Sequence, residues 1–216
     1  PKAAPQTEAE REYEIGKRLL EDPSPSGLRA PDHLKRACDA DHAGACNDLG
    51  WAYDTGFGAL AEDDKKAAEL FELACDLGSA RACLNRGVMA RSTNLAKAAE
   101  YAARACDDEM EEACVKLSGI VNEAKTACEK KPKDCANWGL IQSRGFGVTQ
   151  DRAAALASYE RACTAGDDVG CFNAGIVLRD GTAGRADRAK AKLRFQTACK
   201  RGYDSGCRQA ELLGQR

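Results

Sequence analysis

Apolar and small residues recur every three or four positions through most of the chain, which is the spacing of one face of an α-helix. The segment 67–75 reads Ala-Ala-Glu-Leu-Phe-Glu-Leu-Ala-Cys, and segments 98–106, 155–163 and 191–199 follow the same plan. A second helical pattern begins at a cysteine and runs to a glycine-rich turn, as in residues 135–145. The alternation of these two patterns predicts a series of paired helices, which we call A and B.

The pattern predicts A helices near 7–21, 43–55, 80–91, 110–119, 133–144, 168–179 and 204–213, and B helices near 31–40, 63–77, 95–107, 122–130, 151–165 and 185–201. Gly56, Gly145 and Gly181 suit the C-terminal caps of A helices. The stretch 21–27 is rich in Pro and predicts a loop. Cys114 and Cys128 stand too close in sequence for two full helices, so we expect a truncated repeat there, or one bent helix near Gly119.

Twelve cysteines lie in six pairs, separated by eight positions in five pairs and by seven in one. The pairs are Cys38 and Cys46, Cys75 and Cys83, Cys106 and Cys114, Cys128 and Cys135, Cys163 and Cys171, and Cys199 and Cys207. An even count at constant spacing indicates a disulfide framework, and its recurrence indicates a repeat architecture. Each pair joins the last turn of a B helix to the first turn of the next A helix, within disulfide reach.

Two other interpretations of the cysteines remain open. Zinc sites favour two to four residues between paired thiolates, whereas six or seven intervene here, and His33 and His42 are the chain's two histidines. Free cysteines can also serve as small core residues. We expect no metal and no cofactor.

The cysteine density predicts an oxidising compartment: periplasmic, outer-membrane-associated or secreted. The first residues, Pro-Lys-Ala-Ala-Pro-Gln, lack the features of a signal peptide, so we expect that an export signal was removed. No run of apolar residues is long enough to span a membrane, although a lipid anchor on a longer chain is compatible with the sequence.

The chain has 32 Lys and Arg against 34 Asp and Glu, a formal net charge of -2, which argues against a nucleic-acid binder. Aromatic residues make up only 6%, which favours an all-helical chain. From residue 183 onward, however, basic residues outnumber acidic ones. That end could steer an acidic partner or lie near anionic lipid, or it could be an ordinary solvated helix face.

Three composite sequence motifs of this chain resemble those of a known repeat family. They are Cys-x-Asn-x-Gly (Cys83–Gly87, Cys135–Gly139 and Cys171–Gly175), the Gly-Phe-Gly turns at 56–58 and 145–147, and Ala-Ala-x-x-x-Phe/Tyr-x-x-Ala-Cys. The chain resembles Sel-1-like repeats (SLR), in particular the cysteine-rich bacterial subfamily with one disulfide per repeat. Some positions depart from the pattern: Asp48, Lys116 and Gln209 replace its Asn, and Ser118 and Glu211 replace its Gly.

The resemblance implies an all-α, right-handed α/α solenoid related to tetratricopeptide repeats, with A helices lining a concave face. Residues 7–216 are expected to form one domain of about six repeats with a C-terminal capping helix, and residues 1–6 a disordered N-terminal remnant. The resemblance also implies adaptor or scaffold roles at bacterial envelopes. For some cysteine-rich members it implies weak binding or hydrolysis of β-lactams.

The helical wheel indicates which side of each A helix could bind. Positions three, four and seven after the A-helix cysteine face B, and positions two, five and nine lie opposite, on the expected concave surface. The binding residues predicted there are Asp48, Trp51, Asn85, Val88, Lys116, Asn137, Leu140, Arg144, Asn173 and Ile176. The amides of Asn85, Asn137 and Asn173 could each hold a peptide group by two hydrogen bonds, or could bond neighbouring helices instead.

Motifs of known hydrolases and phosphate-binding loops are absent from the sequence, and no nucleophile stands beside a base. We therefore expect no catalytic residues and a non-catalytic scaffold that binds a protein or an extended peptide on its concave face. The alternatives are a protein that binds or weakly hydrolyses β-lactams, one that binds cell-wall fragments, and a purely structural envelope protein.

Overall fold

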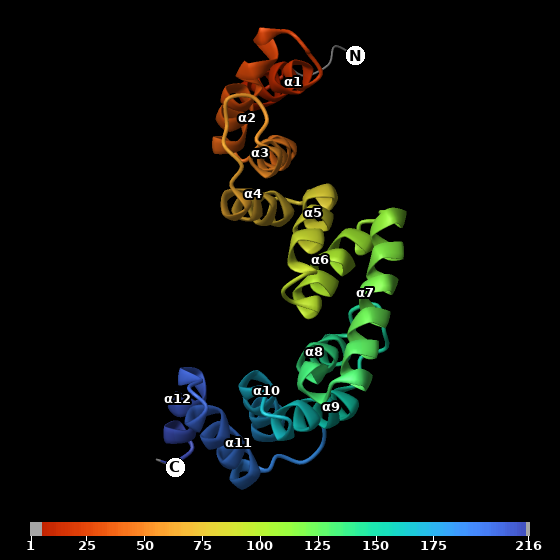
Figure 1. Ribbon diagram of the computed structural model, residues 1–216, viewed down its shortest axis with the longest axis vertical. Coiled ribbons are helices and arrows are strands. Elements are labelled where there is room, and N and C mark those ends of the chain that lie inside the picture. The colour runs from red at the N-terminus through yellow and green to blue at the C-terminus, as the bar shows by residue number, and fades with distance from the viewer. Residues whose placement is uncertain (1–5, 215–216) are drawn as a thin grey trace. The chain divides into compact units, whose positions relative to one another are not determined.

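The structure is a computed structural model, and it describes residues 6–214. Twelve α-helices and two 3-10 helices account for most of these residues (Figure 1). The α-helices are α1 (Glu8–Leu20), α2 (Ala30–Asp39), α3 (Ala43–Thr55), α4 (Asp64–Asp76), α5 (Ala80–Ala90), α6 (Leu95–Asp107), α7 (Glu111–Lys130), α8 (Cys135–Arg144), α9 (Arg152–Thr164), α10 (Asp168–Asp180), α11 (Arg188–Lys200) and α12 (Asp204–Leu212). The expected all-helical fold is confirmed, while residues 1–5 of the predicted N-terminal remnant lie outside the described residues.

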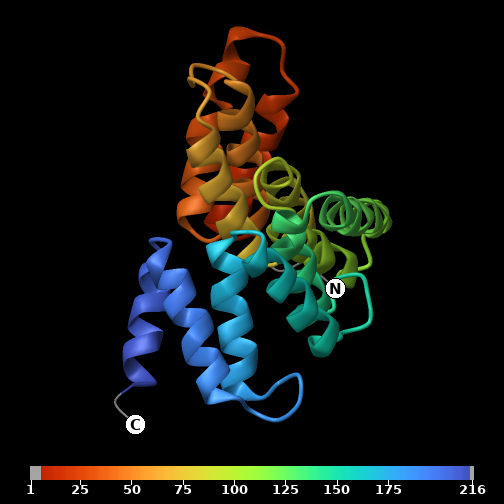
Figure 2. The ribbon, with the colours of Figure 1, turned by 60° about the horizontal axis from the view of Figure 1, so that its bottom comes forward.

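The chain divides into two compact units, one made of residues up to 89 with 104–113, the other of 90–103 with 114 onward. In the first unit, α1 packs on α2, α2 on α3 and α3 on α4. In the second unit, helices α8 to α12 each pack on the next in chain order. Figure 2 shows α10, α11 and α12 side by side, with the loop 181–187 leading into α11. Each unit is therefore built from helices packed in sequence order.

Glycines let the A helices approach the aromatic residues of the following B helices closely. A Cβ added at Gly50, Gly139 or Gly175 would stand within 3 Å of a ring. The rings belong to Phe71, Tyr159 and Phe195 respectively, and all three are at least 98% buried. The predicted B-facing side of the A helices is confirmed at these positions.

Helix ends follow the local sequence. The B helices α4, α9 and α11 are capped by Asp63, Asp151 and Asp187, whose side chains accept backbone N–H groups of the first turn. The A helices α3, α8 and α10 end at Gly56, Gly145 and Gly181, each with a positive φ that glycine adopts without strain. The three predicted C-terminal caps are confirmed.

Disulfides join the ends of successive helices. Five bridges link Cys38 to Cys46, Cys75 to Cys83, Cys128 to Cys135, Cys163 to Cys171, and Cys199 to Cys207. Cys106 and Cys114 are disulfide-bonded as well, and no described cysteine is free. The interpretations of these pairs as zinc ligands or free core thiols are therefore wrong.

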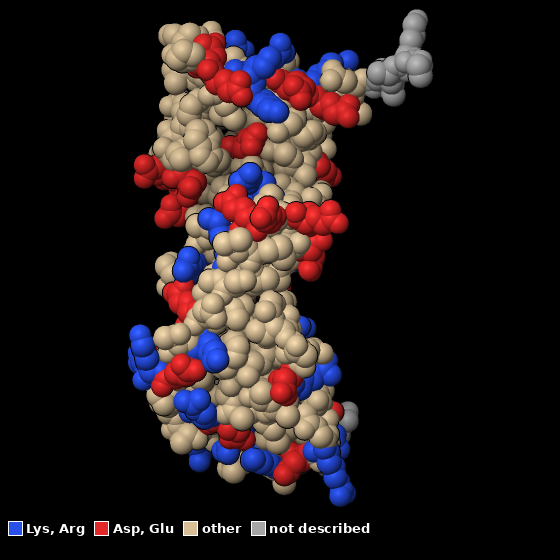
Figure 3. Space-filling model, turned by 90° about the vertical axis from the view of Figure 1, so that its right-hand side faces the viewer, with Lys and Arg blue, Asp and Glu red and all other residues tan. Residues whose placement is uncertain are grey.

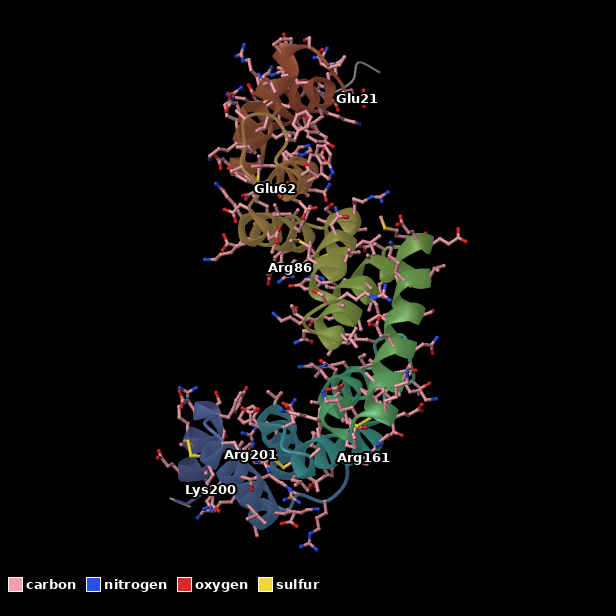
Figure 4. The ribbon with its side chains drawn as sticks, in the orientation of Figure 1. Glu21, Glu62, Arg86, Arg161, Lys200 and Arg201 are labelled. Atoms are coloured by element: carbon pink, nitrogen blue, oxygen red, sulfur yellow. A yellow bond between two sulfur atoms is a disulfide. The ribbon has the colours of Figure 1, made fainter. Side chains whose placement is uncertain are left out.

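Arginines reinforce three of these junctions. Each donates to the carbonyl of the cysteine that lies at the end of an earlier B-type helix: Arg104 to Cys75 at 3.0 Å, Arg161 to Cys128 at 3.4 Å and Arg201 to Cys163 at 2.8 Å. Figure 4 shows Arg161 and Arg201 near the disulfides of their unit. The carbonyls of Cys75 and Cys163 also accept the N–H of Gly78 and Gly166 in the following turns, so there the arginine adds a second bond at the helix end.

Two expectations need correction. The A helix expected near 110–119 and the B helix expected near 122–130 are a single α-helix, α7, which agrees with the alternative of one helix through this repeat. Buried Leu117, Val121 and Ala124 keep one apolar face continuous through the expected break, and Gly119 is an exposed helical position. The stretch 21–27 is not all loop, because Pro25–Arg29 forms a 3-10 helix that Ser24 caps.

No described helix is both long and apolar enough to cross a membrane.

Candidate functional site

Helices α8, α9 and α10 enclose a groove of about 320 Å³ in the second unit. We call it the α8–α10 groove. Its lining residues are Leu140, Ser143, Arg144, Gln150, Arg152, Tyr159, Asn173, Ile176, Val177, Asp180 and Thr182. Four of them, Leu140, Arg144, Asn173 and Ile176, are predicted binding residues. These four residues span 36 positions of the sequence, from Leu140 to Ile176, and the fold places them around one groove.

The floor of the groove is formed by a buried tyrosine. Tyr159 is 98% buried beneath Gly139, and burial raises the pKa of its hydroxyl to about 12, against a smaller opposing effect from its hydrogen bond with Ser143. The hydroxyl therefore stays protonated at neutral pH. Gln150 donates to the Ser143 carbonyl at 2.8 Å, which ties the loop before α9 to the end of α8.

The charge of the groove is positive. Arg144 and Arg152 are exposed, and neither is within ion-pair distance of a carboxylate among residues 6–214. Asp180 already holds Arg179, with oxygen–nitrogen distances of 2.6 and 3.0 Å. That pairing keeps the pKa of the Asp180 carboxyl below its ordinary value. Two guanidinium groups are therefore available to a ligand.

The three asparagines of the predicted ladder differ in their bonding. Asn85 donates to the side-chain oxygen of Asn47 at 3.0 Å, and Asn137 accepts the Ala96 N–H at 3.4 Å. The side chain of Asn173 makes no hydrogen bond with any other residue in the part of the chain that the structure describes. Asn85 and Asn137 therefore bond neighbouring helices, which was the alternative to binding a peptide. The amide of Asn173 lines the groove and has no such bond.

The side chain of Asp48 belongs to a polar network in the first unit. Asn47 donates to the Asp48 carboxylate at 2.9 Å, and the Tyr13 hydroxyl bonds it as well. Burial, the largest effect, raises the pKa of Asp48, while those two bonds and the charges of Lys17 and His42 act in the opposite direction. Asp48, like Asn85, therefore takes part in polar contacts between neighbouring helices.

Replacing Asp48 by Asn, the residue of the repeat pattern, is expected to change the pH dependence of stability. Since folding raises the pKa of Asp48, the folded state binds its proton more tightly, and stability falls as pH rises from the unfolded pKa through the folded one. Asp48→Asn removes that fall, so the free energy of unfolding of the variant relative to wild type should be higher at pH 7 than at pH 3. Urea unfolding at both pH values measures this, with exposed Asp54→Asn as control. A constant difference between the two pH values would contradict the assignment.

The other predicted residues lie outside the α8–α10 groove. Trp51 is 41% exposed and contacts the ring of Phe57 at a centroid distance of 5.4 Å. Val88 is 52% exposed, and Lys116 is half-buried on α7. Their role in binding stays a prediction.

Sequence reasoning missed several lining residues, among them Gln150, Arg152 and Thr182. These residues lie in the turns that follow A helices or at the helix ends beside them. One signal was available: aspartate is a preferred N-cap residue, so Asp151 predicts a helix that begins at Arg152, as α9 does.

The architecture defines a class of protein, a helical-repeat protein with disulfides at the junctions between repeats. Residues 43–79, 80–109 and 132–167 each match the Sel1 repeat model. The chain is therefore a Sel1 repeat protein, as the sequence motifs indicated.

Two curated proteins are similar in sequence to part of this chain. Cytochrome c oxidase assembly factor 7 of Homo sapiens is 36% identical over 99 residues, and that of Mus musculus is 34% identical over 99 residues. Each match covers 40% of this chain and 43% of the relative, so the chain matches less than half the length of these curated proteins.

Two solved structures are similar at low identity. A protective antigen of uropathogenic Escherichia coli that displays an SLR fold is 20% identical, with a TM-score of 0.49, over 92% of this chain and 47% of that one. A Sel1 repeat protein from Oxalobacter formigenes is 20% identical, with a TM-score of 0.44, over 88% of this chain and 85% of that one.

Proposed function

We propose that this protein is a non-catalytic scaffold that works in an oxidising compartment, in the bacterial envelope or outside the cell, and binds an extended segment of a protein partner in the α8–α10 groove. The observation that carries the proposal is the amide of Asn173, which lies beside Leu140, Ile176 and two arginines; among residues 6–214 neither this amide nor either guanidinium group has a side-chain partner. An amide can bond both the N–H and the C=O of a peptide group.

Three further observations support the proposal. The disulfides favour an oxidising compartment. The family match is to a repeat rather than to a catalytic family. The two curated relatives are named as assembly factors, which is compatible with a protein that acts by holding others.

A pair of asparagine variants tests the proposal. The partner is first captured from envelope extract with the oxidised protein and identified, and its affinity is then measured for each variant. Asn173→Ala is expected to weaken binding about tenfold, the effect of losing one to two hydrogen bonds, and to leave the melting temperature nearly unchanged.

Asn85→Ala is the matched control, because its amide bonds Asn47 within the first unit. It should lower the free energy of unfolding by about 1 kcal/mol and leave affinity unchanged. If Asn173→Ala instead reduces stability and leaves affinity intact, the groove does not bind the partner through this amide.

A further inference from the structure

The α8–α10 groove differs in charge from an otherwise similar cavity of the same unit. That second cavity, of about 250 Å³, is lined by Asn137 together with Arg91, Glu123 and Asp134. There Arg91 pairs with Glu123 at 2.8 Å. In the α8–α10 groove the corresponding cations, Arg144 and Arg152, have no such partner among the described residues. The positive charge of the groove is thus a local feature and not a property of every repeat.

The excess of positive charge extends into the next groove along the unit. A cavity of about 330 Å³, which we call the α10–α12 groove, shares Asp180 with the first and is also lined by Arg179, Arg188 and Gln209. Arg179 is held by Asp180 and Gln209, but Arg188 is exposed and forms no ion pair within residues 6–214. Two adjoining grooves therefore offer three unpaired guanidinium groups.

The arginines occupy repeated positions. Arg152 and Arg188 are the first residues of α9 and α11, directly after the capping aspartates Asp151 and Asp187. Each of those aspartates accepts a backbone N–H of its own helix at 2.9 Å, in the manner of an N-cap. On the face of the molecule in Figure 3, acidic and basic side chains are spread in small groups among the other residues.

From this arrangement we infer that the two grooves bind an acidic extended segment of a partner protein, whose aspartate or glutamate side chains pair with Arg144, Arg152 and Arg188 while Asn173 bonds the peptide backbone. The inference rests on the proposed function and adds the chemistry of the partner. Guanidinium groups bind carboxylates through two parallel hydrogen bonds. Adjoining grooves with separate arginines suit a run of acidic side chains better than one terminal carboxylate.

A labelled peptide of alternating serine and glutamate is the probe, because alternate residues of an extended chain project to one side. The full oxidised protein should bind it, and Arg144→Gln with Arg152→Gln should weaken binding about tenfold or more, as expected for the loss of charge-assisted bonds. The control, Lys125→Gln with Lys130→Gln, removes the same charge from exposed positions of α7 and should change affinity less than about threefold.

Other outcomes overturn the inference. Equal binding of a serine–glutamine peptide, still sensitive to Asn173→Ala, would remove the acidic specificity and leave the proposed function standing. No binding of either peptide, or equal losses in the arginine and lysine variants, would contradict the inference, while the proposed function is judged separately by the captured partner.

Two further arms distinguish the source of the anion. Amidation of the peptide's C-terminus should leave affinity unchanged, and a large loss on amidation would assign the grooves to a terminal carboxylate instead. Vesicles containing phosphatidylglycerol should not compete with the peptide, and arginine-dependent binding to the vesicles alone would assign the grooves to a lipid surface.

Discussion

Replacing Cys163 and Cys171 together by Ala is expected to lower the free energy of unfolding by about 3 kcal/mol, because the cross-link closes a short loop in the unfolded chain and removes conformational entropy from it. For a chain of this length such a loss lowers the melting temperature by roughly 6–12 °C. Both cysteines are at least 97% buried at the junction of α9 and α10, and Arg201 donates to the sulfur of Cys171.

The matched control is the double replacement of Cys199 and Cys207 by Ala. This bridge has the same sequence separation of 8, but it attaches α12, which packs on α11 at the end of the described chain. In a helical-repeat protein each element is stabilised by its neighbours, so loss of a terminal bridge should mainly release the last helix. Urea unfolding followed by circular dichroism measures both variants. If both double variants shift the main unfolding transition equally, the stabilisation by a disulfide does not depend on its position along the chain.

Gly175→Ala is expected to destabilise the second unit by about 1–3 kcal/mol, the usual cost of overpacking a core. The added Cβ would lie 2.6 Å from a ring carbon of Phe195, and that ring is fully buried, so it has little room to move. The higher helix propensity of alanine offsets only about 1 kcal/mol of this cost.

Gly119→Ala is the control with the opposite expected sign. Gly119 lies within α7, is exposed, and has no atom within 4 Å of an added Cβ. Helix propensity alone should then raise the free energy of unfolding by roughly 0.5–1 kcal/mol. Thermal unfolding of both variants checks the pair, and stabilisation by Gly175→Ala would contradict the close approach of α10 to α11.

Much of this fold could be predicted from sequence because its repeats encode local features. Cysteine spacing predicted the bridges, and helical periodicity predicted that the position of Gly175, four residues after Cys171, faces the B helix. The merged helix α7 was harder to predict, because glycine lowers helix propensity at Gly119 whereas the buried face through Leu117 and Val121 favours continuity. In the structure the helix is continuous, so burial of this apolar face outweighs the low helix propensity of Gly119.

The candidate site was predictable only in part. A helical wheel identifies the face of α8 and α10 that carries Leu140 and Asn173, since that depends on periodicity alone. It does not show that Asn85 bonds Asn47, which comes from a different helix. It also does not show that Asp180 is occupied by Arg179 while Arg152 has no acidic partner in the described chain. Those differences depend on three-dimensional contacts between repeats.

The most direct test of the scaffold account is site-specific crosslinking to the captured partner. A photoreactive amino acid is placed at Thr182, an exposed residue that lines the α8–α10 groove, and separately at Val115, which is 68% exposed on α7. We expect a covalent adduct from Thr182, mapping to an acidic segment of the partner, and little or none from Val115. An adduct from Val115 without one from Thr182 would place the partner elsewhere and contradict the account.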